Sequence, residues 1–525
     1  MTPPVLARQI VAELAVNSDT RVFEPGFGDG AFLLALIDAF MPLYEGPTTD
    51  RLARILESNV FGIELDPVLR ERALGNVVTR WGPLPATHHL NLGDFLTYDF
   101  GGRSFDVIVG NPPFGGTIDP SKQDELDARY GYRGGAKIKK ESYAFFAVRA
   151  VDLLKQSGRL LFICSNTFLT INTMRGLRRF LMTIGTPHVR QLSSFSDETR
   201  HPVVVLDLRR TGPTDHVTVD RHVLRREIIE QTPNFSWGIT EDLATYFSGA
   251  RLGDYVVATG GMTTGRNEYF VRDIRGDHIW EPFEFEFFDD PITIEKATAK
   301  ARLGRLTGPE RDRTGRAEAS GESVRNVRAV PLPESRQVRI PDGRYAYYNK
   351  ATSSIIFSPP THVIYWADEG DAVLTYKKNG DWYLRGVGGR PYFGREGLTW
   401  QLVAGRLNAR YLPAGFILDS GAPAAFLRAG VPRDELWFIL GWAITSKATE
   451  LLKRVINHTR NIQGKDFERL PYPWWVRPAI KAKVIELTRQ LVAEAIAGRV
   501  VDRSEVELAV LEELFALDKA ASSAA

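Results

Sequence analysis

Short runs of β-branched residues alternate with stretches of helical periodicity over roughly the first 200 residues, and this alternation restricts the fold more than any other feature. Strands alternating with helices of this length are typical of a doubly wound, mainly parallel sheet. We therefore expect an α/β, Rossmann-like domain with its site at the carboxyl ends of the strands. Strands are expected at residues 21–24, 60–64, 105–109, 159–165, 189–192 and 203–208, and helices at residues 29–40, 67–79 and 142–156.

After about residue 240 the helical periodicity weakens, and stretches rich in aromatic residues, glycine and arginine follow. Short strands separated by Gly-Asp and Asn-Gly turns are expected over residues 345–392, and an amphipathic helix over residues 480–517. A chain of 525 residues is long for a single domain. We predict an α/β catalytic domain over residues 1–240, a mixed α+β domain over residues 241–475, and C-terminal helices over residues 476–525.

The composition excludes several classes of protein. Cys164 is the only cysteine, so neither a disulfide framework nor a cysteine-based zinc site is expected, and the nine histidines show no metal-ligand spacing. No apolar run approaches the ~20 residues that span a membrane, and the N-terminus does not resemble a signal peptide. We expect a cytoplasmic protein without a metal or a membrane partner. The net charge of +2 means that any nucleic-acid surface must be local.

A glycine-rich turn follows the first expected strand and precedes a helix. Gly26, Gly28 and Gly30 let the backbone approach a ligand that any Cβ atom would exclude. Such turns bind nucleotide-like cofactors, but they also bind flavins or serve structure alone. Glu64 ends the next strand, where a carboxylate can accept hydrogen bonds from both hydroxyls of a ribose. Asp66, followed by proline, is expected to cap the next helix instead.

Asp94 and Phe95 come third in this series. The Asp94 carboxylate can accept a hydrogen bond from an adenine amino group while Phe95 packs against the ring. An isolated aspartate in such a tetrapeptide is more often a turn residue. The order of the motifs along the chain favours the cofactor role.

The most specific motif is Asn111-Pro112-Pro113-Phe114, directly after a buried strand. The two prolines fix the backbone and remove two N–H donors, so carbonyl oxygens are held in a fixed direction. If the Asn111 side-chain oxygen and the Pro112 carbonyl both accept from the N6 amine of adenine, its nitrogen moves toward tetrahedral geometry. The lone pair can then attack a sulfonium methyl group without a strong base.

Phe114 would give the base a flat apolar surface. A base within a duplex cannot reach such a pocket, so it must be flipped out and stacked. The alternative is that the diproline turn is structural and Phe114 belongs to the core.

These motifs together resemble those of the γ-type, TaqI-like amino-group DNA methyltransferases, and the resemblance runs from Thr2 to Arg210. It implies a class I methyltransferase fold with S-adenosyl-L-methionine as the cofactor. It also implies that Thr2, Glu24 and Pro25 bind the cofactor and that Phe195 is a second aromatic residue against the flipped base. The implied activity is that of an adenine-specific, site-specific DNA methyltransferase.

The second half of the chain is similar, over shorter stretches, to the target-recognition region of PglX-type methyltransferases from BREX and related phage-defence systems. This resemblance implies that residues 241–475 recognise a DNA target. It also implies a role in restriction-modification or phage defence, with other proteins of such a system as partners. The stretches that carry it are residues 260–267, 394–400, 460–466 and 470–473.

Lys137, Lys139 and Lys140, together with the arginine-rich residues 302–344, are the candidate contacts to DNA phosphates. Charge runs of this kind are more often solvated surfaces, and acidic residues are interspersed. Two alternatives to adenine methylation stay open at this point. Similar turns serve enzymes that methylate cytosine N4, RNA bases or protein amides, and a DNA-binding defence component without activity is the second alternative.

Overall fold

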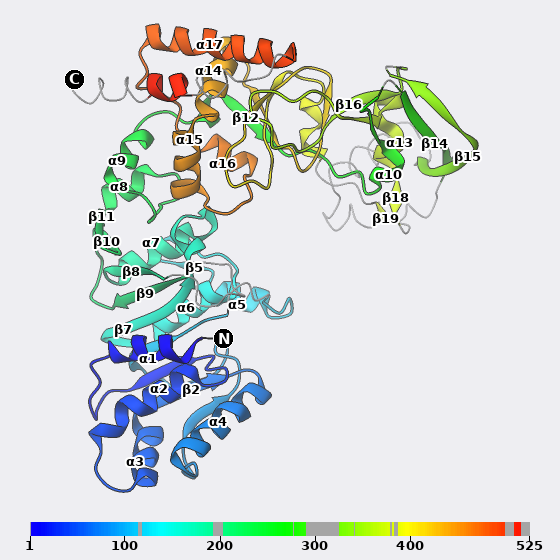
Figure 1. The fold of residues 1–525 in the computed structure, drawn as a ribbon. Helices are drawn as coiled ribbons and strands as arrows, with labels where there is room; N and C mark the ends of the chain where they lie inside the picture. Colours follow the sequence, from blue (N-terminus) through cyan, green and yellow to red (C-terminus); the bar gives the residue numbers. More distant parts are fainter. Residues whose placement is uncertain are drawn as a thin grey trace. The chain divides into compact units, whose positions relative to one another are not determined.

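The computed structural model describes residues 2–113, 118–192, 203–276, 278–289, 325–340, 342–378, 381–382, 387–498 and 509–515. The chain divides into two compact units, coloured by sequence in Figure 1. Unit 1 consists of Met1–Thr245 with Arg454–His458, and unit 2 of Tyr246–Lys453 with Thr459–Ala525. Within the described residues, no helix combines the length and the apolar character needed to cross a membrane.

Unit 1 is built on a nine-stranded sheet. Five of its strands pair in parallel in the order β3-β2-β1-β4-β7. The chain runs outward from β1 to β3 and then returns to the other side of β1, so the strand order reverses between β1 and β4. Ligands of open α/β sheets bind at such a reversal. These strands are β1 (Val22–Pro25), β2 (Val60–Glu64), β3 (His89–Leu92), β4 (Phe105–Gly110) and β7 (Leu154–Ser165).

The rest of the sheet contains antiparallel pairs. β9 lies between β7 and β8 and is antiparallel to both. β10 pairs in parallel with β8, and β11 is the antiparallel edge strand. The predicted Rossmann-like, mainly parallel fold is confirmed, but β3, β10 and β11 were not predicted, because each has only four residues and half of these are polar. The four strands are β8 (Pro187–Leu192), β9 (Val203–Arg209), β10 (His216–Val219) and β11 (His222–Arg225).

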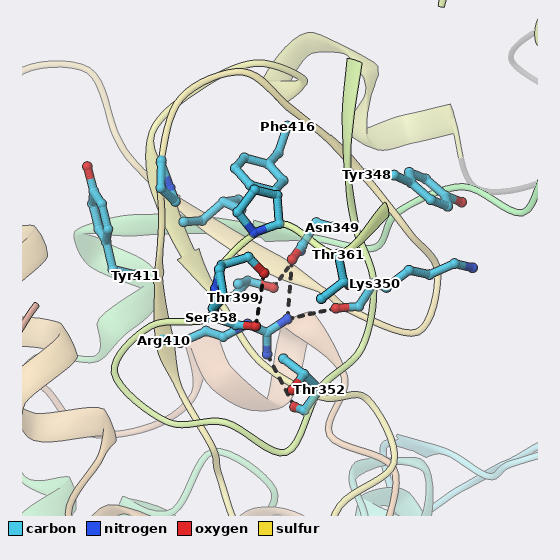
Figure 2. A pocket seen from close by; sticks show the side chains of 14 residues that line it. Tyr348, Asn349, Lys350, Thr352, Ser358, Thr361, Thr399, Arg410, Tyr411 and Phe416 are labelled. Carbon is cyan, nitrogen blue, oxygen red and sulfur yellow. Dashed lines mark hydrogen bonds between the residues drawn. The ribbon is translucent and has the colours of Figure 1, made fainter. Parts of the chain in front are cut away.

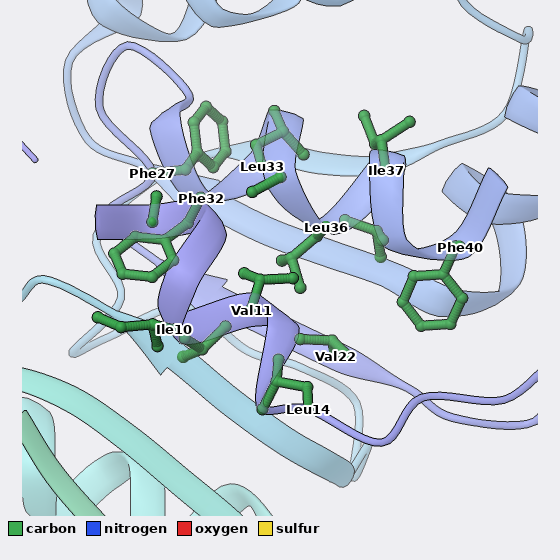
Figure 3. Close-up of a cluster of buried hydrophobic side chains, with 14 of the residues drawn as sticks. Ile10, Val11, Leu14, Val22, Phe27, Phe32, Leu33, Leu36, Ile37 and Phe40 are labelled. Carbon is green, nitrogen blue, oxygen red and sulfur yellow. The ribbon is translucent and has the colours of Figure 1, made fainter. Parts of the chain in front are cut away.

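Helices α1 and α2 cover the sheet beside β1, and their apolar faces form the core shown in Figure 3. Ile10 of α1, Leu36 of α2 and Val22 of β1 are at most 2% exposed. Burying each such side chain contributes about 1.5–3 kcal/mol. The helices and remaining strands of unit 1 are α1 (Pro4–Ala12), α2 (Ala31–Phe40), α3 (Thr48–Arg54), α4 (Pro67–Trp81), α5 (Gln123–Tyr130), β5 (Tyr132–Arg133), β6 (Ala136–Lys137), α6 (Ser142–Leu153), α7 (Arg175–Ile184), α8 (Arg226–Gln231) and α9 (Glu241–Ala244).

Unit 2 combines small sheets with helices. One four-stranded sheet has the order β12-β23-β20-β21, a second has the order β13-β17-β16-β22, and β14 and β15 form a long ribbon. Its strands are β12 (Val256–Thr259), β13 (Val271–Asp273), β14 (His278–Asp289), β15 (Arg325–Arg339), β16 (Tyr345–Asn349), β17 (His362–Tyr365), β18 (Lys377–Lys378), β19 (Asp381–Trp382), β20 (Gly397–Thr399), β21 (Arg410–Leu412), β22 (Phe416–Leu418) and β23 (Ala424–Leu427). Its helices are α10 (Asn267–Phe270), α13 (Asp371–Thr375), α14 (Asp434–Ala443), α15 (Ser446–Leu451), α16 (Gly464–Glu468) and α17 (Pro478–Ile496).

Two local expectations in unit 2 are wrong. The Gly-Asp pair at residues 370–371 opens helix α13 rather than a hairpin, because Gly370 is left-handed (φ +82°) and the apolar residues after it are buried. The predicted helix over residues 480–517 is interrupted. Helix α17 ends at Ile496, and Gly498 has a left-handed backbone (φ +68°), which is typical of a helix terminus.

A buried arginine organises the interior of unit 2. The Arg410 guanidinium is hydrogen-bonded to the Asn349 side-chain oxygen (3.2 Å) and to the carbonyls of Lys350 (3.1 Å) and Thr352 (3.5 Å), as Figure 2 shows. Burial lowers the pKa of Arg410 to about 10. The adjoining cavity has a volume of only about 20 Å³, close to the space of a single water molecule. We therefore interpret this arrangement as structural.

Candidate active site

A cavity of about 660 Å³ lies where β1, β2 and β4 of unit 1 end. This volume is within the range of small-molecule sites, about 300–1,000 Å³. The cavity brings together predicted residues from four separate segments of the chain. The predicted residues that line it are Gly26, Gly28, Glu64, Asp94, Phe95, Asn111 and Pro113.

The glycine turn has the backbone that the sequence analysis expected. Gly26 (φ +69°), Gly28 (φ +56°) and Gly30 (φ +94°) are all left-handed, a conformation that favours glycine. Gly30 does not line the cavity. A Cβ atom there would lie 3.2 Å from the Cβ atom of Ala73, so Gly30 allows α2 and α4 to pack closely.

Glu64 is the last residue of β2, and two backbone N–H groups hold its carboxylate. Gly28 N–H donates to Oε2 (2.7 Å) and Asp66 N–H donates to Oε1 (2.9 Å). Each oxygen can still accept a further hydrogen bond. Glu64 therefore presents a fixed pair of acceptors at the cavity. Asp66 accepts from Val68 N–H (2.8 Å) and caps α4, as predicted.

Glu24 and Pro25 are the last residues of β1 and are not among the residues that line the cavity. Glu24 is 3% exposed. Burial raises the pKa of Glu24 well above its usual range, and the nearby Glu64 and Asp29 carboxylates raise it further. Its Oε2 atom has no hydrogen-bond partner among the described residues. A Cβ atom on Gly110 would lie 3.8 Å from Glu24 Cγ, so this carboxyl group lies beside the strand that leads to Asn111.

Asp94 lines the cavity with both of its oxygens engaged. Oδ1 accepts from Leu96 N–H (3.0 Å), and Oδ2 forms an ion pair with Lys122 Nζ (3.1 Å). Phe95 is 2% exposed and packs against Phe146, with 4.9 Å between the ring centroids. Phe95 is therefore largely a core residue with one edge at the cavity.

Asn111 follows β4 and has one satisfied and one unsatisfied end. Its Nδ2 donates to the Thr2 hydroxyl oxygen (3.0 Å). Its Oδ1 is buried and has no hydrogen-bond partner among the described residues. A buried acceptor without a partner costs about 1–3 kcal/mol, so Oδ1 is available to accept a hydrogen bond from a molecule in the cavity. Thr2 was expected to contact the cofactor, and the structure places it against Asn111 instead of among the lining residues.

Of the remaining predicted residues, Pro112 is buried and Pro113 is exposed at the cavity. Phe114 and Phe195 lie outside the described residues, so their roles stay predictions. Lys137, Lys139 and Lys140 line a separate groove of unit 1.

The arginine-rich segment proposed to contact phosphates lies mostly outside the described residues. Three of its described arginines form ion pairs with acidic residues of unit 2, and these ion pairs balance much of their positive charge. The pairs are Arg328 with Glu286 (2.6 Å), Arg336 with Glu281 (3.2 Å) and Arg344 with Glu281 (2.9 Å).

The sequence analysis missed several residues that line the cavity. Most follow the diproline turn along the chain, where no spacing or motif marks them. Their place in the site depends on how this segment and α6 fold back over the sheet. The missed residues include Ile118, Asp119, Lys122, Leu126, Ser142 and Phe146.

Comparison with known proteins identifies the class of this domain. Residues 86–200 match the family model described as Eco57I restriction-modification methylase, and this range contains the diproline turn. The type II methyltransferase M.TthHB8I of Thermus thermophilus is 30% identical over 217 residues, which cover 40% of this chain and 44% of that protein. The adenine-specific methyltransferase PglX of Lacticaseibacillus casei is 22% identical over 479 residues, which cover 84% of this chain and 35% of that protein.

A solved structure shares the fold over most of the chain. It is a nuclease-deletion mutant of the type ISP restriction-modification enzyme LlaGI, in complex with a DNA substrate mimic. The TM-score is 0.55 at 13% identity, and the alignment covers 94% of this chain and 54% of that one. This chain thus covers between 35% and 54% of the length of these three proteins. Residues 86–200 thus match the Eco57I restriction-modification methylase model, and the chain is similar to type II methyltransferases over 40% of its length and to PglX over 84%.

Proposed function

We propose that this chain transfers a methyl group from S-adenosyl-L-methionine to N6 of a flipped-out adenine in duplex DNA, as part of a restriction-modification or phage-defence system. The observation that carries the proposal is the Asn111 side chain. Its buried Oδ1 has no partner among the described residues, and it lies at a cavity that also contains the Glu64 and Asp94 carboxylates.

The Asn111 amide suits an amine substrate. Its Oδ1 can accept a hydrogen bond from an N6 hydrogen while Nδ2 remains bonded to Thr2. The Pro112 carbonyl, held by the diproline turn, is the proposed second acceptor. Two fixed acceptors draw the nitrogen out of conjugation and stabilise the positive charge that develops on it.

The cavity also fits the cofactor. We assign the ribose hydroxyls to Glu64, whose oxygens are fixed by two backbone donors, and the adenine amino group to Asp94. Glu24 would accept a hydrogen bond from the amino-acid part. When bound, S-adenosyl-L-methionine supplies an electrophilic methyl group on a sulfonium. The chain's task is to hold the amine in line with that group.

DNA is the proposed substrate because of the extent of the similarity. LlaGI, whose structure contains a DNA substrate mimic, aligns over both units of this chain. A protein-amide methyltransferase would not need a second unit of this size. We propose that unit 2 recognises the target sequence and that Phe114 and Phe195 stack on the flipped base.

Adenine is favoured over cytosine by the similarity to PglX, a protein named as adenine-specific, over 84% of this chain. A cytosine N4 amine would meet the same two acceptors, so the choice of base requires a product analysis. A DNA-binding defence component without activity is disfavoured because the described acceptors and carboxylates of the site are present.

Radiolabelled methyl transfer to duplex DNA, followed by nucleoside analysis, tests the proposal. We expect N6-methyladenine in the product and a loss of about 100- to 1,000-fold in kcat for Asn111→Ala, the effect of removing one preorganised electrostatic contact. Methylation-sensitive sequencing of host DNA would then give the target sequence. Label in N4-methylcytosine, RNA or protein would assign another substrate, and equal transfer by wild type and variant would refute a catalytic role for Asn111.

A further inference from the structure

A basic groove of about 590 Å³ lies on unit 1, between β6 and the start of α7. No acidic side chain is among its described lining residues. The two elements are distant in sequence, so the sequence alone could not show that their cations share one surface. The cations that line the groove are Lys137, Lys139, Lys140, Arg175 and Arg179.

A glycine in the first turn of α7 brings the two elements together. A Cβ atom at Gly176 would lie 1.9 Å from the carbonyl oxygen of Lys137, so no other residue fits there without displacing β6. Glycine within a helix costs about 1 kcal/mol relative to alanine. The close packing of the Lys137 backbone against α7, which only glycine permits at this position, compensates for this cost.

Both sides of the groove are anchored in the core. Ile138 is 0% exposed and its N–H donates to the Gly131 carbonyl (2.8 Å), which fixes the backbone between Lys137 and Lys139. On α7, the buried Arg178 donates to the carbonyls of Phe235 (2.8 Å), Ile171 (3.0 Å), Phe168 and Asn234. The adjacent cations are therefore presented on a rigid support.

The groove keeps an excess of positive charge. Lys139 pairs with Glu141 (2.6 Å) and Lys140 pairs with Asp127 (3.0 Å). Arg179 stacks on Phe235, with its guanidinium carbon 5.1 Å from the ring centroid. Lys137 has no carboxylate partner in the described part of the chain. An unbalanced cluster of lysine and arginine suits a polyanion.

The groove is adjacent to the candidate active site. Lys140 lines the groove and Ser142, two residues later, lines the catalytic cavity. Two residues of chain span at most about 7 Å. A strand whose base enters the cavity would therefore pass these cations.

We propose that this groove binds the phosphodiester backbone of the DNA strand that carries the target base. The proposal rests on the proposed function and adds Arg175 and Arg179 to the contacts. Flipping a nucleotide rotates it out of the stack, and phosphate contacts beside it hold the strand in register. The contacts carry no sequence information, so the groove would contribute affinity and position.

The double variant Lys137→Gln/Arg175→Gln tests the groove, with Arg225→Gln as the matched control. Arg225 is an exposed cation on β11 and pairs with Glu227. Binding of a short fluorescent duplex is measured across salt concentrations. Each phosphate contact contributes about 0.9 to the slope of log K against log salt, so the double variant should lose nearly 2 from its slope. Its loss of affinity between about 50 and about 200 mM salt should be about 12-fold smaller than that of the wild type.

The double variant should keep the cofactor affinity of the wild type, and the Arg225→Gln control should match the wild type in DNA affinity, salt dependence and kcat. If the wild type methylates DNA but the double variant shows the same slope of log K against log salt as the wild type, the groove proposal fails and the proposed function stands. Tighter binding of the wild type to single-stranded RNA than to the duplex would overturn the assignment to a DNA strand. If neither the wild type nor any variant methylates DNA, the proposed function itself fails.

A duplex with neutral methylphosphonate linkages beside the target adenine tests which strand the groove holds. Neutral linkages on the target strand should weaken wild-type binding but have little further effect on the double variant. Equal effects on both proteins, or an effect only from the opposite strand, would overturn the assignment.

Discussion

Replacing Thr2 by valine removes the acceptor that satisfies one end of the Asn111 amide. In the wild type, Asn111 Nδ2 donates to the Thr2 hydroxyl at 3.0 Å, and Oδ1 remains available for the substrate amine. Valine has nearly the same shape but cannot accept a hydrogen bond. In the reactive orientation the variant would therefore leave a buried N–H group without a partner.

The magnitude follows from that unsatisfied donor. A buried donor without a partner costs about 1–3 kcal/mol, and each 1.4 kcal/mol is tenfold in rate. We expect kcat to fall between about fivefold and about 150-fold. This loss is smaller than the one expected for Asn111→Ala, because the catalytic oxygen is still present.

Steady-state methylation of duplex DNA, together with cofactor binding by calorimetry, measures this effect. Thr2→Val should lower kcat while leaving cofactor affinity within about twofold of the wild type, and Thr2→Ser, which keeps the hydroxyl, should restore the rate. A Thr2→Val variant with weakened cofactor binding and unchanged kcat would refute the positioning role. It would support the cofactor contact that the family resemblance implies.

Two further predictions concern buried groups of unit 1. Burial raises the pKa of Glu24, so its carboxyl group stays neutral in the folded protein at pH values at which it is ionised in the unfolded chain. The free energy of unfolding therefore falls as the pH rises above about 4.5. In thermal unfolding, Glu24→Gln should therefore become progressively more stable than the wild type as the pH rises above about 4.5. It should also bind the cofactor more weakly. A stability difference that does not change with pH would contradict this. Burial also raises the pKa of the Cys164 thiol to about 12, so a thiol reagent should label the native protein only at the rate of unfolding, and rapid labelling would contradict the buried placement.

The positions of the site residues that were predicted correctly are determined by local sequence. Glu64 ends a buried strand and Asn111 follows another, so parallel pairing alone carries both to one edge of the sheet. Asp66 caps its helix because a proline follows it directly. These features needed only a motif and a strand.

The missed parts depend on contacts between distant segments. Lys122 reaches Asp94 only because the chain after the diproline turn folds back over the cavity, and no spacing marks it. Thr2 meets Asn111 across 109 residues of sequence. Gly176 has a role only because Lys137 lies against it. Such contacts follow from packing, and periodicity and motifs carry no information about them.

The structure of a ternary complex with target duplex and a cofactor analogue that cannot transfer its methyl group is the most direct test of the catalytic assignment. We expect an extruded adenine in the cavity beside Glu64 and Asp94, with N6 at about 3 Å from both Asn111 Oδ1 and the Pro112 carbonyl oxygen. An adenine that remains stacked in the duplex, or one whose N6 faces other groups while Asn111 points away, would contradict it.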